Sequence, residues 1–422
     1  MTLRLAAAVA ALLVAVSCAT STAAPPATSA NDWPMYRGDL HRDGHAQGAT
    51  LTAARAASLH VLWGATPGGA IDGTPVVVGG RVVAATDSGT LAAYDLRTGG
   101  RLWSVDGLGS ISGSPAVAEG IVVAGSTKGH VFGLRLSDGT RLWDWAAPGD
   151  QPAIWASPAI SGGRVLIGIA SPYGDSPLQA GRIASLDLKG GGLQWVICIQ
   201  AGCTPGAGVW SSVAVDEAGR GYVGVGNPVD GVIAFDTVKG TVIWTASFHP
   251  DADRDLDVGA TPVIASVGGR EVVAVGSNAG VFAVLDALNG QFVWTKFLVR
   301  GSAVHGLIAS PAYDGRLLYV PSASVPTGMN AVDPATGTII WQQLTELPVY
   351  SAPALGADVV VFGTGDVFGD AHAGKLIALS TRDGSVVWSY DMKSSVFSAP
   401  AIVGEVVVVG DFQGAVTAFG PA

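Results

Sequence analysis

The chain has 422 residues, of which 49% are hydrophobic and only 13% are charged, and its 59 glycines and 23 prolines indicate strands and turns rather than surface helices. Its formal net charge of -10 excludes nucleic acid as an expected partner, because a phosphate-binding surface needs a basic face. The length suits either two or three ordinary domains or one large repeat fold.

The chain begins with an expected targeting segment, residues 1–18. It carries a positive charge at Arg4 and then an apolar run over residues 5–16, which is short for a membrane-spanning helix. The four residues ending at Cys18, A-V-S-C, resemble a lipoprotein cleavage box with Cys18 as the lipidated residue. The alternative is a plain secretory signal cleaved near residues 22–24. Both alternatives predict export, to the periplasm or the cell surface, with a lipid as the only expected membrane anchor.

Residues 19–31, rich in Ala, Ser, Thr and Pro, are expected to form a flexible tether. In an oxidising compartment, Cys198 and Cys203 are expected to pair as a disulfide that closes a small loop. A metal pair is the weaker alternative, because no His or further Cys lies near them in the sequence. The sequence contains no C-x-x-C-H motif, so we expect no covalently bound c-type haem.

Residues 32–422 repeat one structural unit. Each copy starts with a small residue, followed in most copies by Pro, and continues through Val-rich runs separated by Gly turns. The end of the unit is clearest in Ala93–Trp103, which reads A-Y-D-L-R-T-G-G-R-L-W. A self-similar period of this size is typical of solenoids and propellers. The repeated tryptophans, 40 to 52 residues apart, are Trp63, Trp103, Trp143, Trp195, Trp244, Trp294, Trp341 and Trp388.

The units predict an all-β fold, an eight-bladed β-propeller of four-stranded antiparallel blades. The last unit, residues 399–422, stops after its third strand, whereas Leu59–Trp63 is a strand without a unit of its own. The N-terminal strand is therefore expected to complete the last blade and close the ring, which leaves only short blade edges. Each blade-end tryptophan is expected to pack between neighbouring blades, where such a side chain buries roughly 150–250 Å².

The motif A-x-D-x-x-T-G-x-x-x-W at Ala93–Trp103, repeated at Ala331–Trp341, resembles the tryptophan-docking motif of the PQQ-repeat propellers of quinoprotein dehydrogenases. The same repeat also builds non-catalytic propellers, including outer-membrane assembly lipoproteins. Irregular loops gather between the second and third strands and between blades, and these loops share one face, which is the expected binding face. The loops that open blades four and five look most similar to the polyvinyl-alcohol dehydrogenase branch.

This resemblance implies roles for several residues of blades four and five. Trp210 matches the tryptophan that lies under the flat pyrroloquinoline quinone, and Asn227 matches an asparagine that helps hold a calcium ion. Asp255 is the best match to the general base that takes the alcohol proton, and we place it at the calcium as well. Asp253 and Asp257 are register alternatives. A calcium ion on oxygen ligands would polarise the quinone carbonyl.

The sequence also departs from the resemblance. A calcium-binding Glu is expected in the blade-three loop, where Asp175 is the nearest substitute. A Lys or Arg is expected against the quinone carbonyls, where the chain has the uncharged Asn278. The family's disulfide between adjacent cysteines has no counterpart, because Cys198 and Cys203 lie in another loop.

Two functions follow from these matches and departures. The first is an exported quinoprotein dehydrogenase that oxidises a small or polymeric alcohol and passes electrons to a separate acceptor. The second is a non-catalytic, lipid-anchored propeller that presents one face to protein partners.

Overall fold

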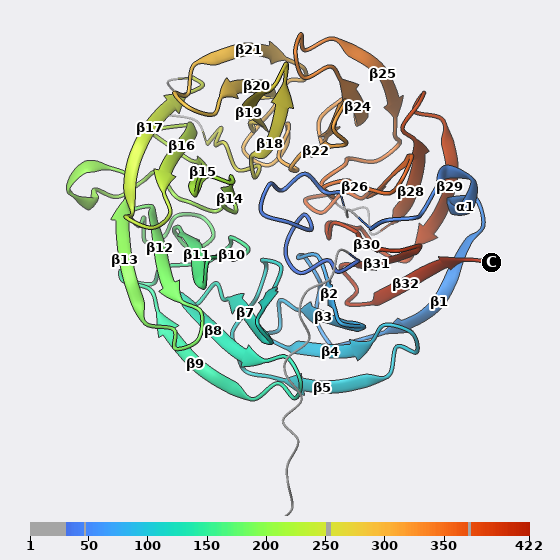
Figure 1. Cartoon of the computed structure of the whole chain (residues 1–422), viewed down its shortest axis with the longest axis horizontal. Coiled ribbons are helices and arrows are strands. Elements are labelled where there is room, and N and C mark those ends of the chain that lie inside the picture. Colours follow the sequence, from blue (N-terminus) through green and yellow to red (C-terminus); the bar gives the residue numbers. More distant parts are fainter. Residues whose placement is uncertain (1–30, 46–47, 250–254, 370–372) are drawn as a thin grey trace, which may run out of the picture.

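The computed structural model describes residues 31–45, 48–249, 255–369 and 373–422, so Cys18, the targeting segment and most of the tether lie outside the described residues. The described chain forms eight four-stranded antiparallel sheets around a central axis (Figure 1). The predicted eight-bladed β-propeller is therefore confirmed. The helices of the described part are α1 (Ala53–Ala56) and the 3-10 helix η1 (Ala201–Cys203). Neither is long or apolar enough to cross a bilayer.

The blades follow one another along the chain, and each runs from an innermost to an outermost strand. The first four blades consist of β2 (Val76–Val78), β3 (Arg81–Ala85), β4 (Leu91–Asp95) and β5 (Arg101–Val105); β6 (Ala116–Ala118), β7 (Ile121–Gly125), β8 (His130–Arg135) and β9 (Arg141–Ala146); β10 (Ala159–Ser161), β11 (Arg164–Ile169), β12 (Arg182–Asp187) and β13 (Leu193–Cys198); β14 (Ala214–Val215), β15 (Arg220–Val225), β16 (Gly231–Asp236) and β17 (Thr241–Ser247).

The remaining blades have the same order, except that the last takes its outermost strand from the N-terminal part of the chain. They consist of β18 (Val263–Val267), β19 (Arg270–Gly276), β20 (Val281–Asp286) and β21 (Phe292–Phe297); β22 (Ala312–Tyr313), β23 (Leu318–Ser322), β24 (Gly328–Val332) and β25 (Ile339–Leu344); β26 (Ala354–Leu355), β27 (Val359–Gly363), β28 (Gly374–Ser380) and β29 (Val386–Met392); β30 (Ala401–Val403), β31 (Val406–Gly410), β32 (Val416–Pro421) and β1 (Leu59–Ala65).

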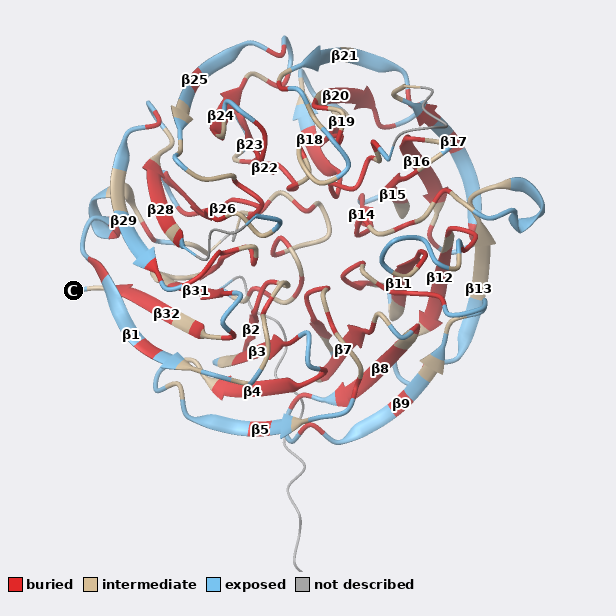
Figure 2. Cartoon of the chain, turned by 180° about the vertical axis from the view of Figure 1, so that it is seen from behind, coloured by how far each residue is buried: buried red, intermediate tan, exposed pale blue. Residues whose placement is uncertain are grey.

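The apolar pattern of the strands follows from their place in a blade. The second and third strands lie between two neighbouring blades, so both of their faces are covered and their sequences are almost continuously apolar, as in β7 and β27. The outermost strands form the rim and are exposed except at the tryptophan, as in β5. Figure 2 shows this as buried inner strands within an exposed outer ring.

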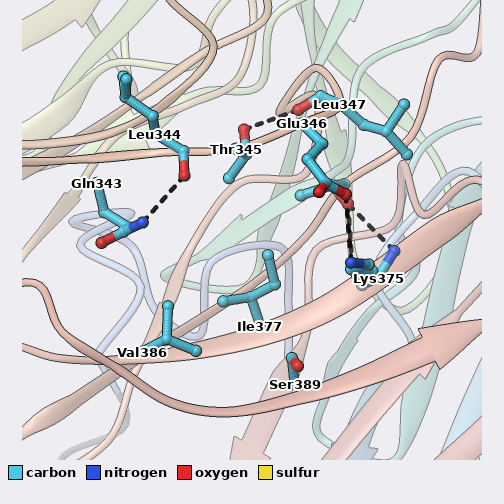
Figure 3. A pocket seen from close by; sticks show the side chains of 10 residues that line it. Gln343, Leu344, Thr345, Glu346, Leu347, Lys375, Ile377, Val386 and Ser389 are labelled. Carbon is cyan, nitrogen blue, oxygen red and sulfur yellow. Dashed lines mark hydrogen bonds and ion pairs between the residues drawn. The ribbon is translucent and has the colours of Figure 1, made fainter.

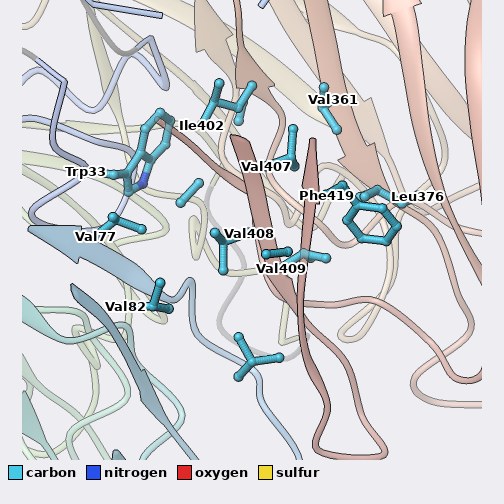
Figure 4. Close-up of a cluster of buried hydrophobic side chains, with 14 of the residues drawn as sticks. Trp33, Val77, Val82, Val361, Leu376, Ile402, Val407, Val408, Val409 and Phe419 are labelled. Atoms are coloured by element: carbon cyan, nitrogen blue, oxygen red, sulfur yellow. The ribbon is translucent and has the colours of Figure 1, made fainter. Parts of the chain in front are cut away.

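The N-terminal strand β1 closes the ring, as predicted. It pairs antiparallel with β32, and Trp63 lies opposite Ala418. The buried cluster at this seam joins three blades, because Val408 and Phe419 of the last blade pack with Leu376 of the seventh and Val82 of the first (Figure 4). Residues from the two ends of the chain thus share one core.

Each blade-end tryptophan packs against the next blade. The indole nitrogen of Trp103 donates a hydrogen bond of 2.8 Å to the carbonyl of Leu136, in the turn of the following blade. Trp63 makes the equivalent bond of 2.7 Å to Leu96, which joins the closing strand to the first blade. Trp195 is the exception, because its indole nitrogen is buried without a hydrogen-bond partner. The same kind of bond is made by Trp143, Trp244, Trp294, Trp341 and Trp388.

The packing of a blade-end tryptophan against the next blade, which we call the tryptophan dock, depends on a β-bulge and on a glycine. In every blade, the ladder between the two outermost strands shifts register beside the tryptophan, and a bulge re-aims the side chain there. In the receiving turn, Gly99 has φ +70° and lies against the ring of Trp63, so that a Cβ at this position would come within 2.7 Å of the ring. The Thr-Gly turn therefore needs glycine for both its conformation and its close approach.

Small hydroxyl side chains link the innermost strands to one another. In the first five blades, the Ser or Thr before the proline, or before Val213 in the fourth blade, donates its N–H to the hydroxyl at the same position of the next blade, beginning with Thr74 to Ser114 at 2.8 Å. In the seventh and eighth blades this position is alanine, and the serine one residue earlier forms the link instead. The hydroxyl of Ser351 donates to the carbonyl of Ser398, and the hydroxyl of Ser398 donates to the carbonyl of Gly73. The bonds between the intermediate blades have the same form.

The segment over residues 33–45 fills the middle of the ring, where Figure 1 shows it as a blue trace inside the blades. Its main chain pairs with innermost strands of blades on opposite sides, including those of Val117, Ile264 and Leu355. Arg37 and Arg42 are fully buried and donate to carbonyls at the starts of other innermost strands. We call residues 33–45 the central plug. The sequence analysis did not predict it.

The tryptophan dock can be tested by comparing two substitutions. Trp103→Phe removes an indole donor and leaves the carbonyl of Leu136 unpaired, whereas Trp195→Phe removes a donor that has no partner. Trp103→Phe is therefore expected to destabilise the protein by about 1 kcal/mol more than Trp195→Phe. Denaturant unfolding of the two variants measures this difference, and equal losses would contradict a role for the hydrogen bond.

The central plug predicts a pH dependence of stability. Burial, together with repulsion from Asp39, raises the pKa of Asp43 to about 8. Because the folded pKa lies above the unfolded one, the folded state binds the extra proton, and stability falls as pH rises between about 4 and about 8. Asp43→Asn keeps an oxygen acceptor for the N–H of His45 and is expected to flatten that fall. Unfolding midpoints at pH 5 and pH 9 measure the effect, and an identical pH slope in both proteins would refute it.

Candidate functional site

The loops between the second and third strands and the loops between blades lie on one face, because all strands of a blade are antiparallel. Of the residues that the sequence analysis proposed for the site, this face carries all that the structure describes. Asp175 lies between β11 and β12, Trp210 precedes β14, and Asn227 follows β15. Asp255 precedes β18, and Asn278 follows β19. Asp253 lies outside the described residues.

Asp257, which the sequence analysis offered only as a register alternative, is the centre of the cluster. Its carboxylate accepts a hydrogen bond of 2.7 Å from the indole nitrogen of Trp210 and one of 3.1 Å from the backbone N–H of Asn227. Its backbone carbonyl accepts a bond of 2.9 Å from the N–H of Asn278. Three loops from the fourth and fifth blades therefore meet at this one residue. We call Trp210, Asn227, Asp255, Asp257 and Asn278 the Asp257 cluster.

The ring of Trp210 has a fixed position. Its nitrogen is tied to Asp257, and its six-membered ring lies against Gly259, where a Cβ would overlap ring atoms. The serine that follows, Ser211, is buried and exchanges hydrogen bonds of 2.9 Å with the backbone of Gly224. Trp210 therefore differs from the blade-end tryptophans, whose nitrogens, apart from that of Trp195, donate to carbonyls of the next blade.

Asp255 and Asp257 lie close enough for each carboxyl group to affect the pKa of the other. Partial burial raises the pKa of Asp255 to about 6, and repulsion from Asp257 and Asp175 adds to this shift. Burial also raises the pKa of Asp257, although the hydrogen bonds from Trp210 and Asn227 oppose the shift. Both shifts favour the protonated forms of the two carboxyl groups, and a cation at this position would oppose them.

Asp175 is exposed and acts on this pair only through its charge. In the part of the chain that the structure describes, no three side chains from His, Cys, Asp and Glu are grouped closely enough to hold a metal ion by themselves. A cation at the pair would therefore need further oxygens. Asn227, whose backbone N–H donates to Asp257, is the amide residue nearest in the hydrogen-bonded set.

Asn278 is buried, with 1% of its surface exposed. Its side-chain nitrogen donates a bond of 2.9 Å to the carbonyl of Ala303, and its side-chain oxygen is buried without a hydrogen-bond partner. The residue therefore has an acceptor to offer, whereas the Lys or Arg of the resemblance would offer a charged donor.

Cys198 and Cys203 form a disulfide with a Cα–Cα distance of 5.2 Å. The bond closes the loop after β13, which projects from the rim of the disc (Figure 1). The disulfide is thus separate from the Asp257 cluster.

A pocket of about 220 Å³ lies elsewhere, on the rim between the sixth and seventh blades (Figure 3). It is lined by residues of β25, β28 and β29, and an ion pair of 3.3 Å between Lys375 and Glu346 lies at its edge. None of the residues proposed from the sequence lines this pocket.

Similar structures include quinoprotein dehydrogenases and BamB. The quinohemoprotein alcohol dehydrogenase from Comamonas testosteroni is 19% identical with a TM-score of 0.82, and the match covers 92% of this chain and 80% of that one. A europium-containing methanol dehydrogenase is 15% identical with a TM-score of 0.80, over 93% of this chain and 98% of that one. BamB from Moraxella catarrhalis is 17% identical with a TM-score of 0.64, and the match covers 86% of this chain and 97% of that one. At these identities the likeness shows the fold alone.

No curated protein matches the sequence. A family model does, and its matches cover almost all of the propeller: residues 44–174, 179–328 and 326–421. Its description is outer membrane protein assembly factor BamB. The chain thus belongs to this family of PQQ-repeat β-propellers.

Proposed function

We propose that the chain is an exported quinoprotein dehydrogenase that oxidises an alcohol at the Asp257 cluster and passes the electrons to a separate acceptor. The observation that carries this proposal is the hydrogen-bonded set of Trp210, Asp257 and Asn227, with Asp255 beside it. An aromatic ring, a carboxylate pair and an amide, which come from separate loops, are held together on the expected binding face.

A calcium ion fits the donor set. Asp255, Asp257 and Asn227 supply oxygens, which are the ligands that hard cations prefer. A divalent cation there would offset the repulsion between the two carboxylates, which contributes to the raised pKa of Asp255. Asp175 adds negative charge nearby and would attract the cation.

Pyrroloquinoline quinone fits the ring of Trp210, because flat aromatic systems stack on such a surface and Gly259 backs the ring. It fits Asn278 less well, since the free atom there is an acceptor. When bound, the quinone accepts the hydride and the cation polarises its carbonyl. In this proposal Asp255 takes the proton from the substrate hydroxyl, while Trp210 and Asn227 keep Asp257 in place.

The second candidate is a non-catalytic propeller that binds protein partners, with a lipid anchor at Cys18. It is favoured by the description of the family model, outer membrane protein assembly factor BamB, and by the uncharged Asn278. In both cases we propose export to the periplasm or the cell surface. The disulfide between Cys198 and Cys203 supports export, because such bonds persist in oxidising compartments.

Cation binding can be measured without the quinone. Terbium is a suitable probe for an oxygen-ligand site, because tryptophan sensitises its luminescence and Trp210 is bonded to Asp257. We expect calcium to displace terbium, and Asp257→Asn to weaken calcium binding at least about tenfold, since a charged ligand is lost. Asp150→Asn is the matched control, because Asp150 is an exposed carboxylate in another loop of the same face. Equal affinities in both variants would contradict the cation site.

Turnover tests the proposed reaction. The protein is reconstituted with pyrroloquinoline quinone and calcium, and dye reduction is assayed with short primary and secondary alcohols. Asp255→Asn is expected to lower kcat by about 10²–10⁴-fold, the usual contribution of a general base, while quinone binding persists. If the wild-type protein binds no quinone and shows no turnover, the dehydrogenase proposal fails and the second candidate stands.

A further inference from the structure

A second group of side chains on the same face has no part in the proposed reaction. His305, Tyr350, Phe368, Phe397 and Phe412 form a chain of ring contacts, which we call the aromatic tract. The ring of Tyr350 lies 6.1 Å from that of His305, 5.5 Å from Phe368 and 5.9 Å from Phe397. Phe397 and Phe412 are 6.2 Å apart.

The five rings come from five of six successive loops of the site face, because the loop between β23 and β24 contributes none. His305, Tyr350 and Phe397 lie in the loops that lead into the sixth, seventh and eighth blades. Phe368 and Phe412 lie between the second and third strands of the seventh and eighth blades. The aromatic tract therefore curves over blades six to eight, next to the blades that build the Asp257 cluster.

The aromatic tract is joined to the Asp257 cluster by one loop. Asn278 donates to the carbonyl of Ala303, and the hydroxyl of Tyr350 donates a bond of 3.1 Å to the carbonyl of Val304. His305 follows directly in the chain. A ligand that starts at the Asp257 cluster can thus continue over the aromatic tract without leaving the face.

The rings are arranged as a buried base with exposed edges. Tyr350 is only 3% exposed, whereas Phe368 and Phe412 are 46% and 36% exposed. Burial of the outer rings would therefore remove apolar surface from water on ligand binding. Polar groups lie beside the rings, since Asp366 accepts the N–H of Phe368, and Gln413 adjoins Phe412 and is exposed.

The chemistry of this surface selects a class of ligand. The carboxylates Asp255 and Asp257 of the adjoining cluster, in a chain of net charge -10, disfavour an anionic polymer. A sugar ring has an apolar face of C–H groups and a rim of hydroxyl donors, which match aromatic rings bordered by carboxylate and amide acceptors. We propose that the aromatic tract binds a neutral oligosaccharide chain, one end of which reaches the Asp257 cluster. The oxidation of that end rests on the proposed function, whereas the binding does not.

Binding is measured by calorimetry with neutral oligosaccharides of four to six hexoses, without quinone or calcium. Phe368→Ala and Phe412→Ala are each expected to weaken binding about three- to tenfold, the range for one aromatic contact. Phe412→Leu keeps an apolar side chain for packing and is expected to weaken binding as well. Phe297→Ala is the matched control, because Phe297 is 64% exposed on the rim strand β21, and it should leave affinity unchanged.

The proposal is overturned if no neutral oligosaccharide binds at millimolar concentration, if the control variant weakens binding as much as the tract variants, or if an acidic polysaccharide or an apolar peptide binds more tightly. Thermal melting of each variant shows that it is folded. Failure here leaves turnover of short alcohols untouched, and absence of turnover leaves oligosaccharide binding untouched, so the two proposals fail separately.

Discussion

The fold depends on closing a ring of blades whose chain ends lie far apart in sequence. The closing strand β1 pairs with β32, and its Trp63 donates to Leu96 of the first blade, as Trp103 does to Leu136. The same contact therefore joins both ordinary neighbours and the seam. Each dock combines a bulge, an indole donor and a glycine turn. Near the axis, hydrogen bonds to Ser and Thr hydroxyls join neighbouring blades in the same way. Because every blade is held on both sides, loops of neighbouring blades meet on one face, and a site can be built from several of them.

The sequence was informative where the structure repeats. The spacing of the tryptophans predicted blade number and closure, because each copy makes the same contact. The central plug could not be predicted, since residues 33–45 occur once and form no repeated pattern; buried Arg37 and Arg42 look like surface residues until their carbonyl partners are in place. The four-residue helix α1 occurs once as well and depends only on a local cap by Thr52.

The sequence predicted which face carries the candidate residues, but it did not predict which carboxylate anchors the cluster. Trp210, Asn227 and Asp255 were expected on one face, and the structure places them there. The register of the acidic loop could not be decided from alternating aspartates, and only the hydrogen bond from Trp210 identifies Asp257 as the anchored carboxylate. The aromatic tract was missed because its rings lie in separate loops with no spacing in common. A sequence signal existed only as single aromatic residues such as Phe412.

The central claim is that the Asp257 cluster holds a cation beside a quinone. The most direct measurement is a crystal structure of the protein grown with calcium and pyrroloquinoline quinone, with anomalous scattering used to locate the cation. The account predicts a cation bound by Asp255, Asp257 and Asn227, with the quinone stacked on Trp210. A cation located away from these side chains, or a quinone absent from the Trp210 ring, would contradict it.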